Sequence, residues 1–299
     1  MSAGHQNCRH CKGPAAIAAR ALVYNPALAS LCHSMFTPDQ IRSIDTQLTS
    51  RHARTQVVQL DGIDVVIKQP EAPLRHWGYP VLNALAQLLR QPMLRAVPAP
   101  GGHAGQGIEV ARLRALAAAG VSVPQVLHVT ERWIALSWLG ARSVDQLLRH
   151  DAQNGRRYWE DGLQAIRDLH RLGQTASQCF ARNMIWHEGK VSFIDFEDDP
   201  VSVMPLASAQ ARDWLLFLHS TAFTLQFADN EAYAARFLHY LRQDDAKVRQ
   251  QVEKAAHTFG WLRILPKQRK PWGRDVMSAQ RAADILHLLS RRMRAEGIV

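Results

Sequence analysis

The sequence predicts an α+β fold with two lobes, in which a β-rich first half precedes a mainly helical second half. Strand-like runs and tight-turn signals gather before Gly140, and long segments of helical periodicity follow it. No internal repeat argues for another architecture. We divide the chain into an N-terminal extension (1–50), a β-rich lobe (51–137) and a helical lobe (138–299).

Length and composition exclude several classes of protein. The chain has 299 residues, 47% hydrophobic and 21% charged, so it is long enough for one or two packed domains and too apolar to be disordered. Four cysteines are too few for a disulfide scaffold, and the longest apolar run, 214–227, is shorter than the roughly 20 residues that span a bilayer. The N-terminus lacks the layout of a signal peptide, so we expect a cytoplasmic protein with free thiols at Cys32 and Cys179.

The net charge of +10 is concentrated at the two ends of the chain. Residues 1–60 hold six Lys and Arg against two acids, and residues 261–299 hold nine against three. Segment 261–274 mixes aromatic and basic residues, and an amphipathic helix is expected over 276–295. Such a helix can lie at an anionic membrane surface, which makes peripheral contact with the inner membrane an alternative. Nucleic acid is an unlikely partner because no motif that reads it accompanies the charge.

The N-terminal extension has several loop signals and no sustained periodicity, so we expect a loosely ordered segment with at most a short helix. It contains Cys8, His10 and Cys11, with Cys32 further along. A zinc site needs four ligands in two well-spaced pairs, and only Cys8 and Cys11 form a recognisable pair. We therefore expect an ordinary tail.

In the β-rich lobe, the runs 55–60 and 63–68 flank Asp61-Gly62 and predict a β-hairpin with a type I′ turn. Lys68 ends the second of these strands. The other elements expected in this lobe are an apolar helix, a helix that Gly120 ends and two short strands, at 81–89, 109–119 and within 121–136.

The second half is mainly helical, with one predicted hairpin made of strands 184–186 and 191–195 around a turn at 187–190. Helical periodicity predicts the remaining elements, at 143–150, 157–171, 208–226, 230–242, 245–258 and 276–295.

Polar residues stand at the ends of the predicted strands. Asn183 immediately precedes one strand of the second hairpin and Asp195 ends the other, so both lie at the same end of that hairpin. Their carbonyl and carboxylate oxygens are the hard ligands that Mg²⁺ prefers, usually together with phosphate oxygens. A strand lysine, Lys68, can hold nucleotide phosphates beside such a metal, and Glu109 is the well-placed helix carboxylate to hold the lysine.

The order Lys, Glu, Asn, Asp over residues 55–220 resembles the protein-kinase-like fold, in particular the bacterial lipopolysaccharide-core kinases related to aminoglycoside phosphotransferases. The spacings that carry the resemblance are Glu109-x3-Leu113-x2-Leu116-x3-Gly120-Val-x-Val-Pro124, Leu169-His170-x2-Gly173, and Asn183 followed by Ile194-Asp195-Phe196. Asp213 matches the aspartate that opens the next helix and braces the catalytic loop, although its residue type also suits a helix cap.

The resemblance implies ATP and Mg²⁺ as cofactors. Lys68 would contact the α- and β-phosphates and Glu109 would position it. Asn183 and Asp195 would hold Mg²⁺. The hinge that lies against adenine would be the stretch 137–140, with Ser137 and Leu139.

Two departures from the family pattern bear on activity. Counting back from Asn183, the family's His-Gly-Asp triplet falls on Ala176-Ser177-Gln178, and the amide of Gln178 cannot accept a proton. Residues 41–60 contain no glycine, so the phosphate-covering glycine-rich loop is missing or replaced by another device. The glycines between 101 and 107 follow Lys68 instead, and we expect them to form a flexible lead into the Glu109 helix.

A general base contributes about 10²–10⁴-fold to rate, whereas positioning and charge neutralisation carry most of phosphoryl transfer. Gln178 therefore predicts a slow enzyme or a binding protein, in which its amide can still orient a hydroxyl. Glu197 occupies the position where the family has glycine, and three roles remain open for it: a substitute base, a ligand of a second metal, or a solvated acid. For Asp198 and Asp199 we expect a solvated turn.

Three functions follow from these observations. The first is a Mg·ATP-dependent phosphotransferase acting on a non-protein acceptor, such as a cell-envelope sugar or another small molecule. The second is a pseudokinase, a nucleotide-responsive binding module that lacks the catalytic aspartate. The third is a basic protein that binds a membrane surface.

Overall fold

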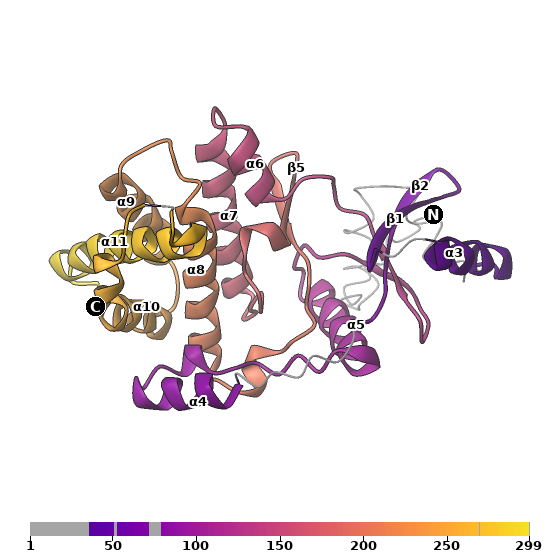
Figure 1. The fold of residues 1–299 in the computed structure, drawn as a ribbon, viewed down its shortest axis with the longest axis horizontal. Helices are drawn as coiled ribbons and strands as arrows, with labels where there is room; N and C mark the ends of the chain where they lie inside the picture. The colour runs from indigo at the N-terminus through magenta and orange to yellow at the C-terminus, as the bar shows by residue number, and fades with distance from the viewer. Residues whose placement is uncertain (1–35, 51–52, 72–78, 269, 299) are drawn as a thin grey trace, which may run out of the picture.

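The computed structural model describes residues 36–50, 53–71, 79–268 and 270–298. The protein is a mixed α and β structure, rich in helices, with two small antiparallel sheets, as the sequence predicts at this level (Figure 1). The strands are β1 (Thr55–Leu60), β2 (Ile63–Lys68), β3 (Val126–Val129), β4 (Ile134–Ser137), β5 (Met184–His187) and β6 (Lys190–Phe193). The helices are α3 (Pro38–Ser50), α4 (Tyr79–Leu88), α5 (Gly102–Ala118), α6 (Val144–His150), α7 (Gly155–Arg171), α8 (Leu206–Ala222), α9 (Asn230–Leu241), α10 (Ala246–Thr258) and α11 (Gly273–Ala295).

The larger sheet has the strand order β1-β2-β4-β3, with every neighbouring pair antiparallel. The predicted hairpin is confirmed: β1 and β2 pair in register from Thr55 with Lys68 to Leu60 with Ile63. Both turn residues have the positive φ that a type I′ turn requires, 50° at Asp61 and 81° at Gly62. This register puts Lys68 at the end of β2, opposite the turn.

Helix α3 packs on this sheet. Its buried Ile44 and Leu48 join a hydrophobic cluster with Val58 and Val65 of the hairpin. The helix lies inside the segment 1–50, and Cys8, Cys11 and Cys32 of that segment lie outside the described residues. Figure 1 shows α3 beside β1 and β2, at the opposite end of the protein from α9, α10 and α11.

Helix α5 is longer than predicted. It begins at Gly102, and Gly101 precedes it as the N-cap; φ is 65° at Gly101 and 53° at Gly102. The expected flexible lead is therefore largely helical. Burial of Val110, Leu113 and Leu116 outweighs the weak helix propensity of the glycines. Glu109 therefore lies in the interior of the helix, 3% exposed, and not in a solvated first turn.

The second hairpin forms as predicted, with Met184 opposite Phe193. Beyond the last strand pair, the amide of Ile194 donates to the carbonyl oxygen of Asn183 at 3.0 Å. The residue pair Asn183 and Asp195 consequently lies at one end of this hairpin, as expected.

The helices of the second half pack into the main hydrophobic core. A Cβ atom at Gly162 of α7 would lie 2.5 Å from the ring of Phe217 of α8, so only glycine allows this close approach of the two helices. Ile285, Leu289 and Met293 of α11 are buried in the same core. The apolar face of α11 is therefore covered by the protein itself and is not free to lie on a membrane. Among the described residues, no helix is both long and apolar enough to cross a bilayer.

Candidate functional site

Lys68 is the centre of a buried cluster of charges. Its Nζ lies 2.8 Å from a carboxylate oxygen of Glu109, 2.9 Å from Asp195 and 2.8 Å from Glu197. The sheet supplies Lys68, helix α5 supplies Glu109, and the segment after β6 supplies the other two. The side chains of Lys68, Glu109 and Glu197 are between 3% and 12% exposed, whereas Asp195 is 31% exposed and is the carboxylate that solvent reaches.

Burial and ion pairing act against each other in this cluster. Burial disfavours the charge of Lys68, but Glu109, Asp195 and Glu197 outweigh it and raise the pKa of the ammonium above its ordinary value. Burial raises the pKa of Glu109, and the neighbouring Lys68 opposes that effect. The lysine therefore stays charged throughout the physiological range.

Asp195 is held in an unusual backbone conformation, with φ of 71°. A non-glycine residue with positive φ is uncommon and costs free energy, and outside turns such residues cluster at functional sites. On the adjoining loop, the side-chain amide of Asn183 donates to the backbone oxygen of Gln178 at 3.0 Å, which fixes the orientation of the Asn183 side chain.

The chemistry of this cluster fits a divalent cation. Carboxylate oxygens of Glu109, Asp195 and Glu197 lie within 4.8 Å of one another. All three carboxylates are paired with Lys68, and Glu197 also with Arg54. Asp195 is the most exposed of the three, so it and the neighbouring Asn183 are the residues placed to offer oxygen ligands. Hard oxygen donors of this kind suit Mg²⁺, completed by phosphate oxygens and water.

A cavity of about 650 Å³ opens beside the charge cluster. Its volume is within the range of pockets that hold small molecules and cofactors. Apolar walls come from Val57 and Val66 of the larger sheet on one side and from Ile185 and Ile194 of the second hairpin on the other. Val57 is 50% exposed although it is a strand valine, because its side chain faces this cavity.

Six of the residues predicted from the sequence line this one cavity: Lys68, Glu109, Ser137, Leu139, Asn183 and Asp195. They come from β2, from α5, from the end of β4 and the residues after it, and from the residues just before and just after the second hairpin, which lie at the same end of it. Gln178 and Glu197 do not line it. Ser137 is tied to Gln125 by two hydrogen bonds of 2.9 Å, which fix the start of the stretch expected to face a base.

Arg54 is a residue of the cavity that sequence reasoning missed. It lines the cavity at its mouth and forms ion pairs with Glu71, at 3.1 Å, and with Glu197. It stands just before β1, in the region where the family would carry its glycine-rich loop. The only sequence signal was a basic residue in a loop without glycine.

Glu197 is engaged by two cations, Lys68 and Arg54, and its side chain is 12% exposed. Its carboxylate therefore belongs to the charge cluster. The other two acids differ from each other: Asp199 pairs with Arg112 at 2.7 Å and is 37% exposed, whereas Asp198 is only 5% exposed. The expectation of a solvated turn is thus wrong for Asp198.

Asp198 lies against Gln178. Gln178 Nε2 approaches Asp198 Oδ2 at 3.4 Å, and Ser177 Oγ donates to the Asp198 backbone oxygen at 3.1 Å. Burial raises the pKa of Asp198 to about 6, because nearby Arg212 and Arg112 compensate only in part. Its Oδ1 atom is buried without a hydrogen-bond partner in the described structure. The buried carboxyl group of Asp198 thus lies beside the uncharged amide of Gln178.

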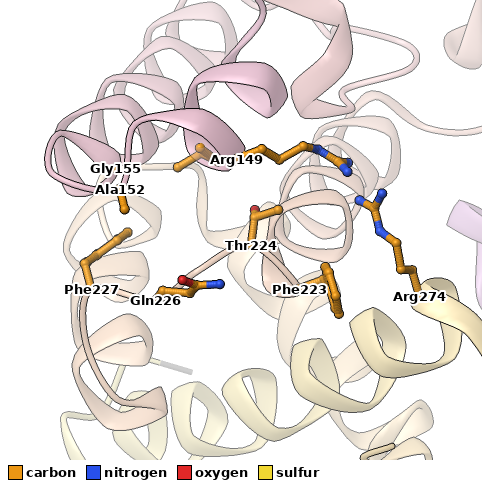
Figure 2. A pocket seen from close by; sticks show the side chains of 9 residues that line it. Arg149, Ala152, Gly155, Phe223, Thr224, Gln226, Phe227 and Arg274 are labelled. Atoms are coloured by element: carbon orange, nitrogen blue, oxygen red, sulfur yellow. The ribbon is translucent and has the colours of Figure 1, made fainter. Parts of the chain in front are cut away.

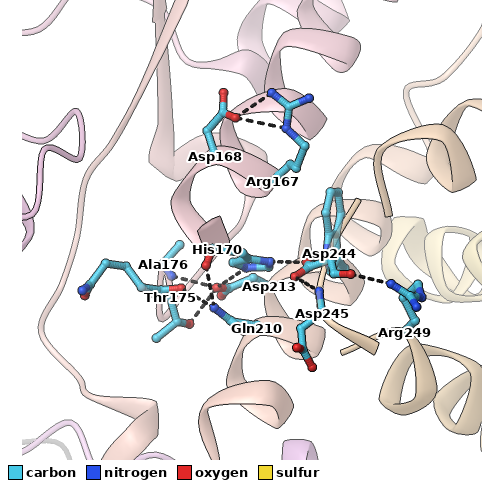
Figure 3. Close-up of polar contacts among 12 residues, drawn as sticks. Arg167, Asp168, His170, Thr175, Ala176, Gln210, Asp213, Asp244, Asp245 and Arg249 are labelled. Carbon is cyan, nitrogen blue, oxygen red and sulfur yellow. Dashed lines mark hydrogen bonds and ion pairs between the residues drawn. The ribbon is translucent and has the colours of Figure 1, made fainter. Parts of the chain in front are cut away.

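Asp213 anchors the loop that runs from Thr175 to Gln178. This residue is completely buried within α8, and its Oδ2 accepts hydrogen bonds from Thr175 Oγ1 at 2.6 Å and from the Ala176 amide at 2.8 Å. It braces the loop, as the resemblance implies, and does not cap a helix. Figure 3 shows His170 between Asp213 and Asp244, and the ring nitrogens lie 3.3 Å and 2.6 Å from these carboxylates.

Burial lowers the pKa of His170, but hydrogen bonds and ion pairs with Asp213 and Asp244 outweigh this effect and raise the pKa overall. The two carboxylates therefore favour the protonated form of the buried His170 ring that links them. This network fixes the path of the chain into Ser177, whose φ is 67°, and Gln178.

Comparison with known proteins assigns a family to the middle of the chain. Residues 95–238, just under half of the chain, match the lipopolysaccharide kinase (Kdo/WaaP) family. The kinase-like resemblance inferred from the sequence is thereby confirmed. The matched segment contains Glu109, Asn183 and Asp195, whereas Lys68 precedes it. A search of the curated proteins found no match.

Proposed function

We propose that this protein is a two-lobed, kinase-like phosphotransferase that uses Mg·ATP to phosphorylate a cell-envelope sugar. The observation that carries the proposal is the convergence of six predicted nucleotide and metal residues on one cavity of about 650 Å³. The match of residues 95–238 to the lipopolysaccharide kinase family supports the same reaction class and a sugar acceptor.

The residues have separate roles in this proposal. Adenine lies between the apolar walls and against the stretch from Ser137 to Leu139. Lys68, kept in position by Glu109, binds the phosphates, and Arg54 takes the place of the glycine-rich loop at the cavity mouth. Asn183 and Asp195 hold Mg²⁺, which when bound neutralises charge on the phosphates.

Gln178 affects the step in which the acceptor hydroxyl loses its proton, because an amide cannot accept that proton. The amide of Gln178 orients the acceptor hydroxyl, and Asp198, in contact with Gln178, accepts its proton. The acceptor oxygen bonds to the γ-phosphorus of ATP as the bond from that phosphorus to the bridging oxygen breaks, and ADP leaves. A carboxyl with a pKa near 6 is close to the value that suits a general base at neutral pH.

The test is thermal unfolding with ATP, with and without Mg²⁺, on the wild type and on Asp195→Asn. ATP at about 100 times Kd stabilises a protein by about 2.7 kcal/mol. We expect a Mg²⁺-dependent rise in Tm that Asp195→Asn loses. Absence of a shift in the wild type would remove nucleotide binding and the proposal with it.

A pseudokinase is the second candidate, favoured by Gln178 alone. It predicts the same Mg²⁺-dependent binding of ATP but no transfer of the γ-phosphate to any envelope acceptor. Transfer that Asp198→Asn abolishes while ATP binding persists would exclude this candidate.

Peripheral contact with the cytoplasmic face of the inner membrane fits the acceptor, and we propose it for the basic segment between α10 and α11. Trp261, Ile264 and Trp272 are 60%, 83% and 56% exposed, and Arg263 and Lys267 lie among them. Exposed aromatic and basic residues together bind anionic lipid surfaces. Co-sedimentation with anionic and neutral vesicles at low and moderate salt tests this contact, and equal binding to both kinds of vesicle would contradict it.

A further inference from the structure

Two adjoining cavities, of about 400 and 310 Å³, share the side chains of Arg149 and Arg274. Arg149 comes from α6 and Arg274 from the first turn of α11. In Figure 2 the two guanidinium groups extend toward one another across the larger cavity, above Phe223 and Thr224. Two cations that face the same space repel each other unless an anion lies between them.

The smaller cavity reaches the loop that carries the candidate metal ligand. Phe180 and Arg182 of this loop line it, and Arg182 directly precedes Asn183 in the chain. The smaller cavity and the proposed nucleotide cavity are thus lined by consecutive residues of one loop, Arg182 and Asn183. Neither arginine lines the cavity that contains Lys68 and Asp195.

The charge balance of the two cavities is positive. Within the described residues, neither Arg182 nor Arg274 forms an ion pair, whereas Arg149 is bound by Asp145 through contacts of 2.8 and 2.6 Å. The other acid at the smaller cavity is the exposed Asp275. His219 adds no compensating negative charge, and its burial lowers its pKa, which favours the neutral ring.

The arginines are also preorganised. The guanidinium of Arg182 lies 4.3 Å from the centre of the Phe180 ring, and that of Arg274 lies 5.1 Å from the Phe223 ring. Stacking on a ring limits the freedom of a guanidinium while leaving its N–H groups available to a bidentate anion. Thr224, Gln226 and Phe227 line the larger cavity with the hydroxyl, amide and ring surface that a sugar contacts.

We infer that Arg182 and Arg274, assisted by Arg149, bind a phosphomonoester group already present on the sugar acceptor. The inference rests on the proposed function, which it deepens by assigning the acceptor an anionic group. Guanidinium groups bind phosphate with paired, charge-assisted hydrogen bonds, and discriminate it from a neutral sugar. The acceptor would thus be held through its existing phosphate while a hydroxyl elsewhere on it reaches the loop of Gln178 and Asn183.

The test is calorimetric titration of the whole protein, without nucleotide, with glucose 1-phosphate, glucose and inorganic phosphate. We expect glucose 1-phosphate to bind more tightly than inorganic phosphate and glucose not to bind. The variant Arg182→Gln/Arg274→Gln should bind glucose 1-phosphate at least about tenfold more weakly. The variant Arg182→Lys/Arg274→Lys keeps the charge and should lose less affinity for glucose 1-phosphate than the glutamine variant. If the glutamine variant does not fold, the lysine variant still tests the inference, because it should bind glucose 1-phosphate more weakly than the wild type.

The matched control is Arg242→Gln/Arg292→Gln, which removes the same charge from two exposed arginines that pair with Glu296 and Glu231. It should bind glucose 1-phosphate like the wild type. Equal loss in the control, unchanged binding in Arg182→Gln/Arg274→Gln, or no preference for the sugar phosphate over inorganic phosphate would overturn the inference. The Mg·ATP-induced rise in Tm of the same variants separates this inference from the proposed nucleotide site. If neither the wild type nor any variant shows a rise, the nucleotide site is contradicted, whereas the sugar-phosphate titration, made without nucleotide, still tests the arginines.

Discussion

Gln178 Nε2 lies 3.4 Å from Asp198 Oδ2, so the loop position that has lost its carboxylate is in contact with a carboxylate from the segment after β6. The two residues are twenty positions apart in the sequence. Asp198 is buried, has one oxygen without a partner among the residues that the structure describes, and has a pKa raised to about 6. A group that is costly to bury and incompletely satisfied is typical of a functional residue.

The first prediction concerns the stability cost of Asp198. Between about pH 4 and pH 6 the unfolded chain loses the Asp198 proton while the folded protein retains it, because the pKa rises from 3.8 to about 6 on folding. The folded state therefore loses about 3 kcal/mol of stability over this interval relative to a variant without the carboxyl. We expect Asp198→Asn to raise the free energy of unfolding above that of the wild type at pH 7, as measured by urea denaturation at pH 4, 5, 6 and 7.

The control for this experiment is Asp199→Asn, which changes an acid that is 37% exposed and paired with Arg112. It should not change the pH dependence. An Asp198→Asn variant that is no more stable than the wild type at pH 7 would show that the carboxyl is better solvated than the structure indicates.

Lys68 holds together three carboxylates, and its removal gives a second prediction. In Lys68→Met, Glu109, Asp195 and Glu197 lie within 4.8 Å of one another with Arg54 as the remaining cation. We expect this variant to be less stable at pH 7 and to bind Mg²⁺ alone more tightly than the wild type, because the metal replaces the lost charge. Its Mg·ATP affinity should fall, since the phosphates lose their lysine.

Thermal unfolding with MgCl₂ alone measures this effect, with the exposed Lys247→Met as the control for loss of one positive charge. A larger Mg²⁺-induced rise in Tm in Lys68→Met than in Lys247→Met is the expected result. Equal rises in the two variants would contradict a cation site at this cluster.

The third prediction concerns His170, the buried histidine between Asp213 and Asp244. Its pKa is raised in the folded protein, so its contribution is fully present below the unfolded value near 6.5 and is lost as the pH rises through the folded value. We expect the wild type to lose stability above pH 6.5 and His170→Gln to lack this loss. The variant should also be about 3–5 kcal/mol less stable at pH 6, because two buried carboxylates lose their partner.

Urea denaturation of both proteins from pH 6 to pH 9 provides the measurement. His239→Gln, which changes a histidine near the end of α9, is the control for a generic loss of imidazole. A wild-type curve that is flat above pH 6.5 would mean that His170 is neutral in the folded protein.

Local sequence signals predicted the elements that place the site. The Asp61-Gly62 turn fixed the register of the first hairpin, and the short second hairpin brought Asn183 and Asp195 to one end. These predictions succeed because turn chemistry acts over a few residues. The oxygen donors of Asn183 and Asp195 and their positions at strand ends predicted a Mg²⁺ site, whereas the cavity that they line with Lys68 is seen only in the structure.

Long-range effects account for what the sequence did not reveal. The extension of α5 to Gly102 depends on burial that glycine propensity opposes, and the burial of Asp198 depends on contacts with Ser177 and Gln178 that no spacing shows. Arg54 is recognisable only through its ion pair with Glu197, 143 residues away. Such contacts are set by how elements pack, so no pattern within one segment records them.

The last prediction exchanges the two groups in contact. The double variant Gln178→Asp/Asp198→Asn restores a carboxylate to the loop position where the family resemblance expects one and leaves an amide beside it. Asp198→Asn alone should lower phosphoryl transfer by about 10²–10⁴-fold, the usual contribution of a general base. Gln178→Asp alone places a second carboxylate close to that of Asp198, which raises the pKa of one of them and destabilises the protein as the pH rises. The exchange avoids this repulsion, so we expect it to recover most of the activity that Asp198→Asn loses, with Mg·ATP binding unchanged in all three variants.

The measurement for these variants is transfer of the γ-phosphate from labelled ATP to envelope glycan. A double variant that folds and binds ATP but is as inactive as Asp198→Asn would show that the carboxylate at position 198 does not act as the base.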